Sequence, residues 1–194
     1  MAIQTQKIEP HWNYFLTIER DLTEISRYVE FDKRNFRCFS IEFARILLAS
    51  GAEVDVVCKQ ICRNIQSNST ANNILDYQNE ILPVYANIPR FQINVPRFGL
   101  SMKPWSEWRK PTNAPKWWTA YNKTKHNRDL EYYRANLKNA LNSVAGLYIM
   151  VLYLYKNSAE NGRLFPHPQL FRVEEKYVGG GEIHLLDSLV NYTL

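Results

Sequence analysis

The chain has 194 residues, of which 45% are hydrophobic and 22% charged, and a formal net charge of +5. These values are ordinary for a soluble globular protein and allow one domain with a substantial core. The longest apolar run, residues 144–155, is too short to span a bilayer, so we expect no membrane association. The sequence opens without a basic and apolar leader, so we expect no signal peptide and a cytoplasmic location.

The cysteines and histidines do not have metal-binding spacing. Cys58 and Cys62 lie four residues apart on a predicted helix, where small buried side chains are the simpler interpretation and metal binding the weaker one. Cys38 and the four histidines are scattered, without C-x-x-C or H-x-x-x-H spacing. We therefore expect neither a metal site nor a cofactor.

Positive charge is concentrated in one part of the chain. Residues 90–128 contain nine lysines or arginines and one acid, Glu107, which gives this segment +8 and leaves −3 for the rest. A concentrated patch attracts anions more strongly than the same charge spread over a surface. The sequence therefore predicts an anion-binding region within residues 90–128.

Three long segments have the spacing of amphipathic helices. Apolar residues recur at steps of three and four over about 11–30, 36–66 and 130–156. Gly51 lies on the apolar stripe of the second segment, where it predicts either a close backbone crossing or a local kink. The pattern favours an all-α fold with a helical domain over residues 1–157.

Residues 83–115 interrupt the helical pattern. Six of the nine prolines fall here, so a long helix is excluded, and we expect an insertion that lies over one side of the helices. The alternation of Phe91, Ile93 and Val95 predicts a short strand, with a turn at Gly99. Four of the five tryptophans lie in or beside this insertion, which favours packing over disorder.

Two smaller elements complete the predicted architecture. A short helix is expected between Thr70, as its N-cap, and Pro83. Residues 158–194 form a C-terminal tail in which β-like runs at 170–173 and 183–186 predict a small hairpin.

A dense polar cluster precedes the last long helix, either before a new helix start capped by Asp129 or within one continuous helix. Histidine can exchange protons near neutral pH, and lysine or arginine can hold a phosphate. Metal-independent RNA cleavage needs such an acid and base, with cations for the charged transition state. In a continuous helix, Asp129 would share a face with His126 and could orient its ring. The simpler alternative is a helix end that collects polar residues. The cluster comprises Tyr121, Asn122, Lys123, Lys125, His126, Asn127 and Arg128.

The same residues resemble the HEPN superfamily (higher eukaryotes and prokaryotes nucleotide-binding). The stretches HWNYFLTIERDLTEISRYVEFDKRNF and IEFARILLASGAEVDVVCK also resemble the opening helices of bacterial HEPN-like proteins. The likeness covers roughly residues 10–155 without the proline-rich insertion. The matching pattern is Trp117-Trp118, Tyr121-Asn122, Lys125-His126-Asn127-Arg128 and Ala135-Asn136-Leu137-x-Asn139-Ala140-Leu141.

This resemblance implies an antiparallel helical bundle, often a homodimer, with a ribonuclease site across the dimer axis and a role in phage defence or toxin–antitoxin systems. A cognate antitoxin is then a possible partner. The family motif places four to six residues between an arginine and the histidine that follows it. Here the histidine corresponds to His126, and the arginine positions hold Thr119, Ala120 and Tyr121.

Two functional hypotheses follow from the cluster and the resemblance. In the first, a metal-independent ribonuclease, His126 is the general acid or base, Lys125 and Arg128 clamp phosphate, and Asn122 or Asn127 positions the scissile group. In the second, a non-catalytic module binds RNA, a nucleotide or an acidic protein with the 90–128 patch. A structural or assembly protein without a ligand is the third possibility. Aromatic rings interleaved with cations suit single-stranded RNA, because bases stack on aromatic rings. The same rings can instead be buried anchors of the core. The residues expected to contact nucleic acid are Lys116, Lys123, Asn127, Trp117 and Tyr121.

We place the homodimer contact at residues 147–155, which carry more apolar surface than one helical stripe needs to pack against the core.

Overall fold

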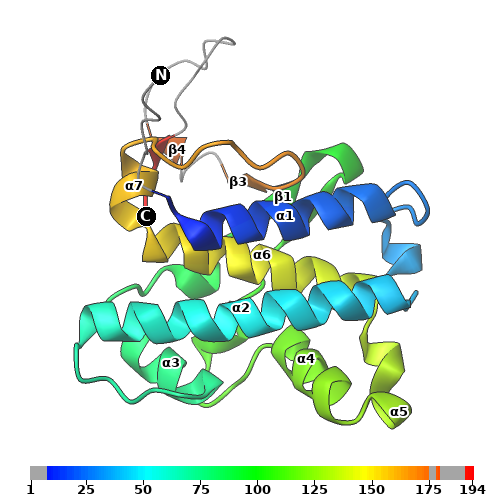
Figure 1. Cartoon of the computed structure of the whole chain (residues 1–194), viewed down its shortest axis with the longest axis horizontal. Coiled ribbons are helices and arrows are strands. Elements are labelled where there is room, and N and C mark those ends of the chain that lie inside the picture. Colours follow the sequence, from blue (N-terminus) through cyan, green and yellow to red (C-terminus); the bar gives the residue numbers. More distant parts are fainter. Residues whose placement is uncertain (1–7, 175–177, 180–190) are drawn as a thin grey trace, which may run out of the picture.

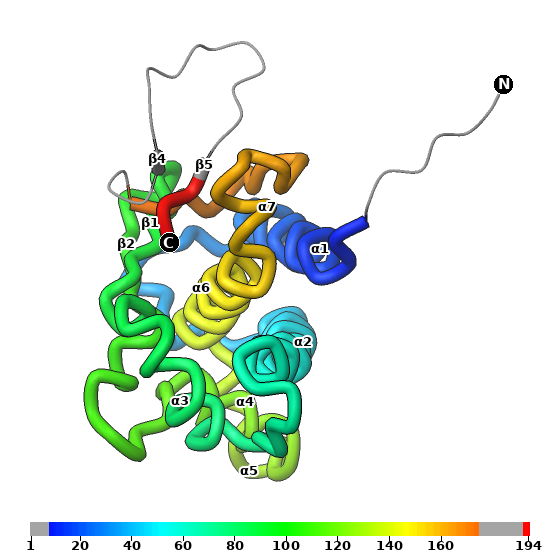
Figure 2. The backbone as a smooth tube through the Cα atoms, turned by 90° about the vertical axis from the view of Figure 1, so that its left-hand side faces the viewer, coloured from blue at the N-terminus to red at the C-terminus, as the bar shows by residue number. Residues whose placement is uncertain are grey.

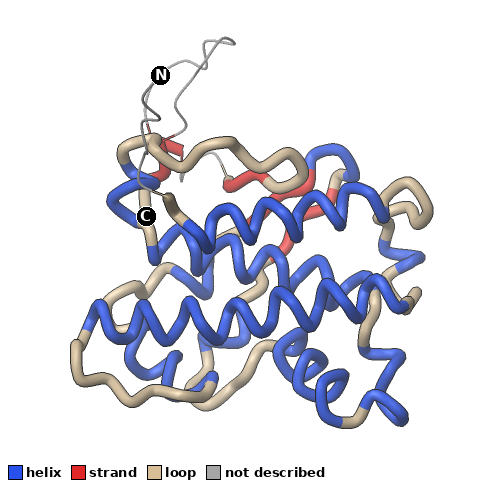
Figure 3. The backbone as a smooth tube through the Cα atoms, in the orientation of Figure 1, coloured by secondary structure: helices blue, strands red, loops and turns tan. Residues whose placement is uncertain are grey.

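The computed structural model describes residues 8–174, 178–179 and 191–194, and helices predominate in it (Figures 1 and 3). The helices are α1 (Pro10–Ile25), α2 (Ile41–Ile65), α3 (Ile74–Ile81), α4 (Lys116–His126), α5 (Arg128–Glu131), α6 (Leu137–Leu154) and α7 (Lys156–Glu160). The strands are β1 (Ile93–Val95), β2 (Leu100–Met102), β3 (Arg172–Val173), β4 (Val178–Gly179) and β5 (Asn191–Tyr192). The prediction of a mainly helical fold is confirmed.

The core is formed by α1, α2 and α6, with α4 packed against both α2 and α6 (Figure 1). Helices α2 and α6 start at the same end of the molecule, where Phe39 and Asn136 form an isolated bridge. Further along, the Ser50 and Ser143 hydroxyl groups meet at 2.7 Å in the buried interface. These two helices therefore run parallel, and α1 runs opposite to both (Figure 1). The expected antiparallel arrangement is right for α1 but wrong for the α2–α6 pair.

Helix α6 is surrounded by the rest of the chain. Every residue from Ser143 to Tyr153 is buried, because α1 and α2 cover one side and residues 83–115 the other (Figure 2). By length and mean hydropathy α6 could span a membrane, and it is the one such helix in the described chain, yet 78% of it is buried within the protein. The homodimer contact predicted at residues 147–155 is wrong, since most of these side chains fill the core.

Local capping explains why the long helices are shorter than their apolar patterns. Helix α2 starts after Ser40, whose Oγ accepts the Phe43 N–H at 3.1 Å. Helix α6 starts after Asn136, whose Oδ1 accepts the Asn139 N–H at 3.1 Å, seven residues later than the pattern indicated. The predicted N-cap of α3, Thr70, is wrong. Asn73 is the N-cap instead, because its Oδ1 accepts the backbone N–H groups of Leu75 and Asp76 in the first turn of α3.

The proline-rich insertion covers one side of α6, as predicted (Figure 2). It contains β1 and β2, which pair antiparallel through a turn at Gly99, whose φ is 60°. Two indole N–H groups anchor the insertion: Trp105 donates to the Gly146 carbonyl at 3.1 Å, and Trp117 donates to the Pro104 carbonyl at 2.8 Å. The tryptophans of the insertion pack, as expected, instead of serving as an exposed platform.

The described part of the C-terminal tail is joined to the helical core, with no structural boundary at residue 157. Strand β3 pairs with β1, giving the sheet order β2-β1-β3. The carboxylate of buried Glu19 accepts three backbone N–H groups, from residues 169, 170 and 171, at 2.8 to 2.9 Å. The short strands β4 and β5 pair antiparallel. The predicted run at 183–186 lies outside the described residues.

Candidate nucleic-acid interface

Helix α4 carries most of the predicted site residues but distributes them around its axis. Successive residues turn by about 100°, so side chains three or four positions apart share a face. Trp118, Asn122 and Lys125 therefore lie on one face, while Lys116 and Lys123 lie on another. Ten residues also separate the two ends of α4, which places Lys116 roughly 15 Å along the axis from the last residue.

Two aromatic residues predicted to contact nucleic acid are buried. Trp117 is 2% exposed and Tyr121 is 5% exposed, on the side of α4 that faces α2 and α6. An ideal Cβ at Gly146 would be 2.9 Å from the Trp117 ring, which shows how closely this ring packs on α6. Trp117 and Tyr121 therefore serve mainly as packing residues, and the burial of their rings leaves little surface for a base to stack on.

Asn122 and Lys125 line a small polar hollow of about 400 Å³ between α4, α2 and the start of α3. Lys125 Nζ lies 5.7 Å from the centre of the Tyr121 ring. Asp55 lines the same hollow, where its carboxylate accepts hydrogen bonds from Tyr77 at 2.7 Å and from Lys59 at 2.5 Å. This carboxylate therefore has its own partners, Tyr77 and Lys59, apart from the cationic cluster.

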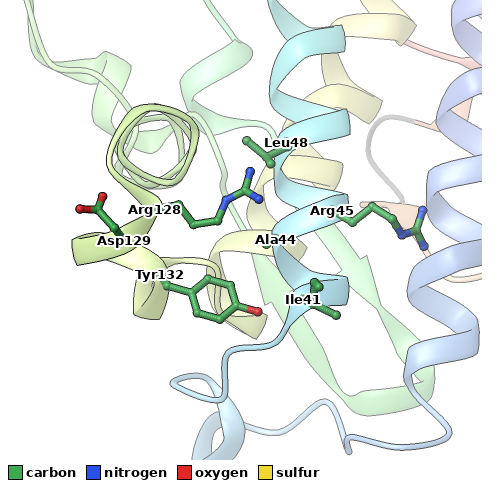
Figure 4. A pocket seen from close by; sticks show the side chains of 7 residues that line it. All are labelled: Ile41, Ala44, Arg45, Leu48, Arg128, Asp129 and Tyr132. Atoms are coloured by element: carbon green, nitrogen blue, oxygen red, sulfur yellow. The ribbon is translucent and has the colours of Figure 1, made fainter.

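Arg128 lines a different, mainly apolar hollow of about 770 Å³ between α2 and α5 (Figure 4). Its guanidinium points into the space beside Leu48, while Asp129 points away from it (Figure 4). Arg45 also turns away, toward α1, where it pairs with Asp21 at 2.7 Å. The hollow is lined by Ile41, Ala44, Arg45, Leu48, Arg128, Asp129 and Tyr132.

His126 is exposed at the end of α4, and it lines neither the hollow of Asn122 and Lys125 nor the hollow of Arg128. The helix breaks at Asn127, with φ −136° and ψ 45°, so α4 neither continues into α6 nor restarts at an Asp129 cap. No hydrogen bond joins Asp129 to His126 in the described structure. Within one chain, the predicted catalytic set of His126, Lys125, Arg128 and Asn122 is therefore not brought together.

A second polar cluster, around His11, lies far from α4 in the sequence. His11 Nδ1 is 2.5 Å from Glu53 Oε1, and His11 Nε2 is 2.8 Å from Gln60 Nε2. Both ring nitrogens thus have protein partners, one on each of two positions of α2. We interpret this cluster as a structural link between α1 and α2.

The strongest concentration of free positive charge lies along two adjoining hollows on the other face of α4, which we call the cationic groove. One hollow, of about 670 Å³, contains the 33–37 segment, and the other, of about 440 Å³, contains the 100–109 segment. Both hollows include Phe36, Lys116, Lys138 and Asn139, so they share a wall. The cations of the groove are Lys33, Arg34, Arg37, Lys103, Arg109, Lys116, Arg134 and Lys138.

Backbone pairing holds the groove together. The Leu137 N–H donates to the Cys38 carbonyl at 2.9 Å, and the Lys138 N–H donates to the Phe36 carbonyl at 3.3 Å. The 33–38 segment is therefore fixed against the first turn of α6. The backbone N–H groups of this turn already donate to acceptors within the protein. Side chains must therefore provide the hydrogen-bond donors that a ligand in the groove would meet.

Most of the groove's charge is not neutralised. Arg34 pairs with Asp32, and Arg134 pairs with Glu131. Hydrogen bonding from these two arginines holds the pKa of both carboxyl groups below the usual range, so both pairs remain charged near neutral pH. The other six cations have no carboxylate within 4.0 Å among the described residues, and Glu107 is the one acid that lines the groove.

The sequence pattern indicated only part of this surface. Lys116 was predicted to bind nucleic acid and lines both hollows, whereas Lys123 lies outside them and approaches Glu131 at 4.0 Å. The contributions of residues 33–37 and of Lys138 were missed. The available signal was the dense KRNFR run, three cations in five residues, which looked like an ordinary solvated link.

The chain matches no protein-family model, and it has no significant match among curated proteins or solved structures. In the described part of the chain, no group of three histidine, cysteine, aspartate or glutamate side chains is arranged to hold a metal ion.

Proposed function

We propose that this protein binds single-stranded RNA, with the phosphate backbone held in the cationic groove. The observation that carries the proposal is a concave surface with eight cations and one acid, where six of the cations have no carboxylate partner among the described residues. Neutralising phosphates releases condensed counterions, which is the main source of affinity for a nucleic acid.

The shape of the groove favours a nucleic-acid strand over a flat anionic surface. The cations line two hollows in sequence, and Phe36, half-buried, lies on the wall between them. A groove that alternates phosphate-binding cations with an aromatic ring fits an unpaired strand, because every base has a face that can stack. A lipid surface would instead favour an exposed apolar face with cations at its rim.

The salt dependence of binding tests this proposal. If all six unpaired cations contact phosphate, the logarithm of the association constant falls with the logarithm of salt concentration with a slope of about −4 for a single strand. Fluorescence anisotropy with labelled oligouridine at several salt concentrations measures this slope. A slope near zero, or no binding at low salt, would contradict the proposal.

A second candidate function is metal-independent RNA cleavage by His126, in a defence or toxin–antitoxin setting with a cognate antitoxin, as the resemblance to HEPN proteins implies. The observation in its favour is that His126 is exposed, makes no hydrogen bond in the described structure and is close in sequence to Lys123 and Lys125. Because one chain does not assemble the other groups, cleavage on this hypothesis needs a second copy across an axis near α5.

The corner formed by α2 and α5 is the best place for such a homodimer contact. Ile41 is 72% exposed and Leu130 is 78% exposed, and two further exposed rings lie next to these helices: Phe39 just before α2 and Tyr133 just after α5. Clustered apolar side chains on a surface usually mark an interaction site. A two-fold axis would also let Arg128 of one copy approach Asp129 of the other.

A further inference from the structure

The two hollows of the cationic groove differ in the hydrogen bonds that they can offer. Lysine and arginine side chains donate only, and they dominate the hollow at residues 33–37, which therefore suits acceptors such as phosphate oxygens. The hollow at residues 100–109 has more acceptors, because Asn142 and Glu107 line it together with Asn139, which both hollows share. A ligand that fits the whole groove must therefore present hydrogen-bond donors in the second hollow.

The side-chain amides of Asn139 and Asn142 are fixed in orientation by the helix. Asn139 Nδ2 donates to the Arg134 carbonyl at 2.9 Å, and Asn142 Nδ2 donates to the Lys138 carbonyl at 2.8 Å. A carbonyl oxygen can only accept, so the amide nitrogen must face it in both cases. Each Oδ1 atom is consequently left over, and neither receives a hydrogen bond from the described protein.

These two asparagines are neighbours on α6. Residues three apart on a helix share a face, and both side chains line the same hollow beside Lys138. Glu107 adds a third acceptor, partly engaged by the Ser106 hydroxyl at 3.3 Å. Cations that hold phosphates thus stand next to a set of acceptors at the position that a sugar or base would occupy.

We propose that Asn139 and Asn142 are specificity-determining residues, which select nucleotides that carry a hydrogen-bond donor next to a bound phosphate. This inference rests on the proposed function. We assign the donor to one of two groups: the ribose 2′-hydroxyl, or the exocyclic amino group of cytosine or adenine. Both would donate to the free Oδ1 atoms.

The experiment compares three strands of equal length: oligouridine, oligodeoxyuridine and oligocytidine. Oligouridine differs from oligodeoxyuridine only by the 2′-hydroxyl, whereas oligocytidine has an amino group in place of the uracil O4 and an unprotonated N3 in place of the uracil N3–H. We expect the parent to prefer oligouridine to oligodeoxyuridine, or oligocytidine to oligouridine. Each neutral hydrogen bond should give roughly a two- to tenfold difference in dissociation constant.

Asn142→Leu removes one oxygen at similar size and should reduce that preference while leaving the salt slope unchanged. Asn139→Leu provides a second variant, with its melting temperature measured because Asn139 also holds the Arg134 carbonyl. Asn13→Leu, on the exposed face of α1, is the matched control and should keep the preference.

The inference is wrong, while RNA binding stands, if the parent binds all three strands equally. It is also wrong if both Asn142→Leu and a folded Asn139→Leu keep the full preference. If the parent binds no strand, the proposed function itself fails.

Discussion

The ring of Tyr121 packs directly against the backbone of Gly51. An ideal Cβ at position 51 would lie 2.4 Å from Tyr121 Cδ2 and 2.5 Å from Cγ, closer than any ordinary contact. This packing brings α4 against α2 and explains why a glycine interrupts the apolar stripe of a long helix. The sequence pattern suggested a crossing backbone or a kink, and the structure shows an aromatic side chain instead.

Gly51→Ala should therefore destabilise the protein, although alanine favours helices. The gain in helix propensity is about 1 kcal/mol, while overpacking a filled core typically costs about 1–3 kcal/mol. The ring cannot move easily, because Trp118 and Lys125 also contact it. Urea unfolding should show a lower free energy of unfolding, and Tyr121→Leu in the same chain should restore part of it. A more stable single variant would show that the ring gives way.

The apolar periodicity predicted the existence of the long helices, but not their ends. Side chains such as Ser40 and Asn136 set the starts of α2 and α6 through hydrogen bonds with the next turn, and such caps are short polar signals within an apolar pattern. The pattern also contains no direction, so the parallel course of α2 and α6 could not be predicted from it.

The candidate site was predictable only in part, because it is assembled from distant segments. Lys116 lies in the basic stretch that the sequence identified, but Lys33, Arg37 and Lys138 reach the groove through tertiary contacts. The sequence grouped His126 with its neighbours, whereas the helical twist of α4 directs these neighbours to different faces. Proximity in sequence was thus a poor guide to proximity in space.

Alkaline pH should destabilise the fold through its buried thiols. Burial raises the pKa of Cys62 to about 12 and raises that of Cys58, whereas unfolded thiols ionise near pH 9. The folded state then holds these protons more tightly, so the contribution is complete below pH 9 and is lost as pH rises toward 12. The free energy of unfolding from urea titrations should fall across this range. Cys62→Ala should flatten the fall, and exposed Cys38→Ala should not; a fall unchanged in Cys62→Ala would contradict the assignment.

The corner at α2 and α5 can be tested as the homodimer contact. Leu130→Asp puts a charge at its most exposed apolar side chain and should shift a dimer to monomer in sedimentation at micromolar concentration. Val84→Asp makes the same change at an exposed residue of the turn after α3 and should leave the dimer intact. A parent that sediments only as a monomer would refute this contact.

Cleavage by His126 predicts a specific loss. A general acid or base contributes roughly 10²–10⁴-fold, so His126→Ala should cut unstructured RNA at least a hundredfold more slowly than the parent in EDTA, with a similar melting temperature. Cleavage that persists undiminished in the variant would exclude His126 as the acid or base. A parent that binds RNA and leaves it intact would reject the ribonuclease hypothesis and leave RNA binding standing.

The most direct test of RNA binding in the cationic groove compares two charge-matched variants. Lys116→Glu/Lys138→Glu reverses two exposed lysines on the wall that both hollows share, and Lys125→Glu/Arg20→Glu reverses two exposed cations outside the groove. The two variants have equal net charge, so a difference in their RNA affinity reflects where on the surface the charges were reversed. Anisotropy with oligouridine should show the groove variant losing at least tenfold in affinity and about 1 to 1.5 in salt slope. The other variant should lose little of either. Equal losses in both variants, or a larger loss outside the groove, would contradict the account.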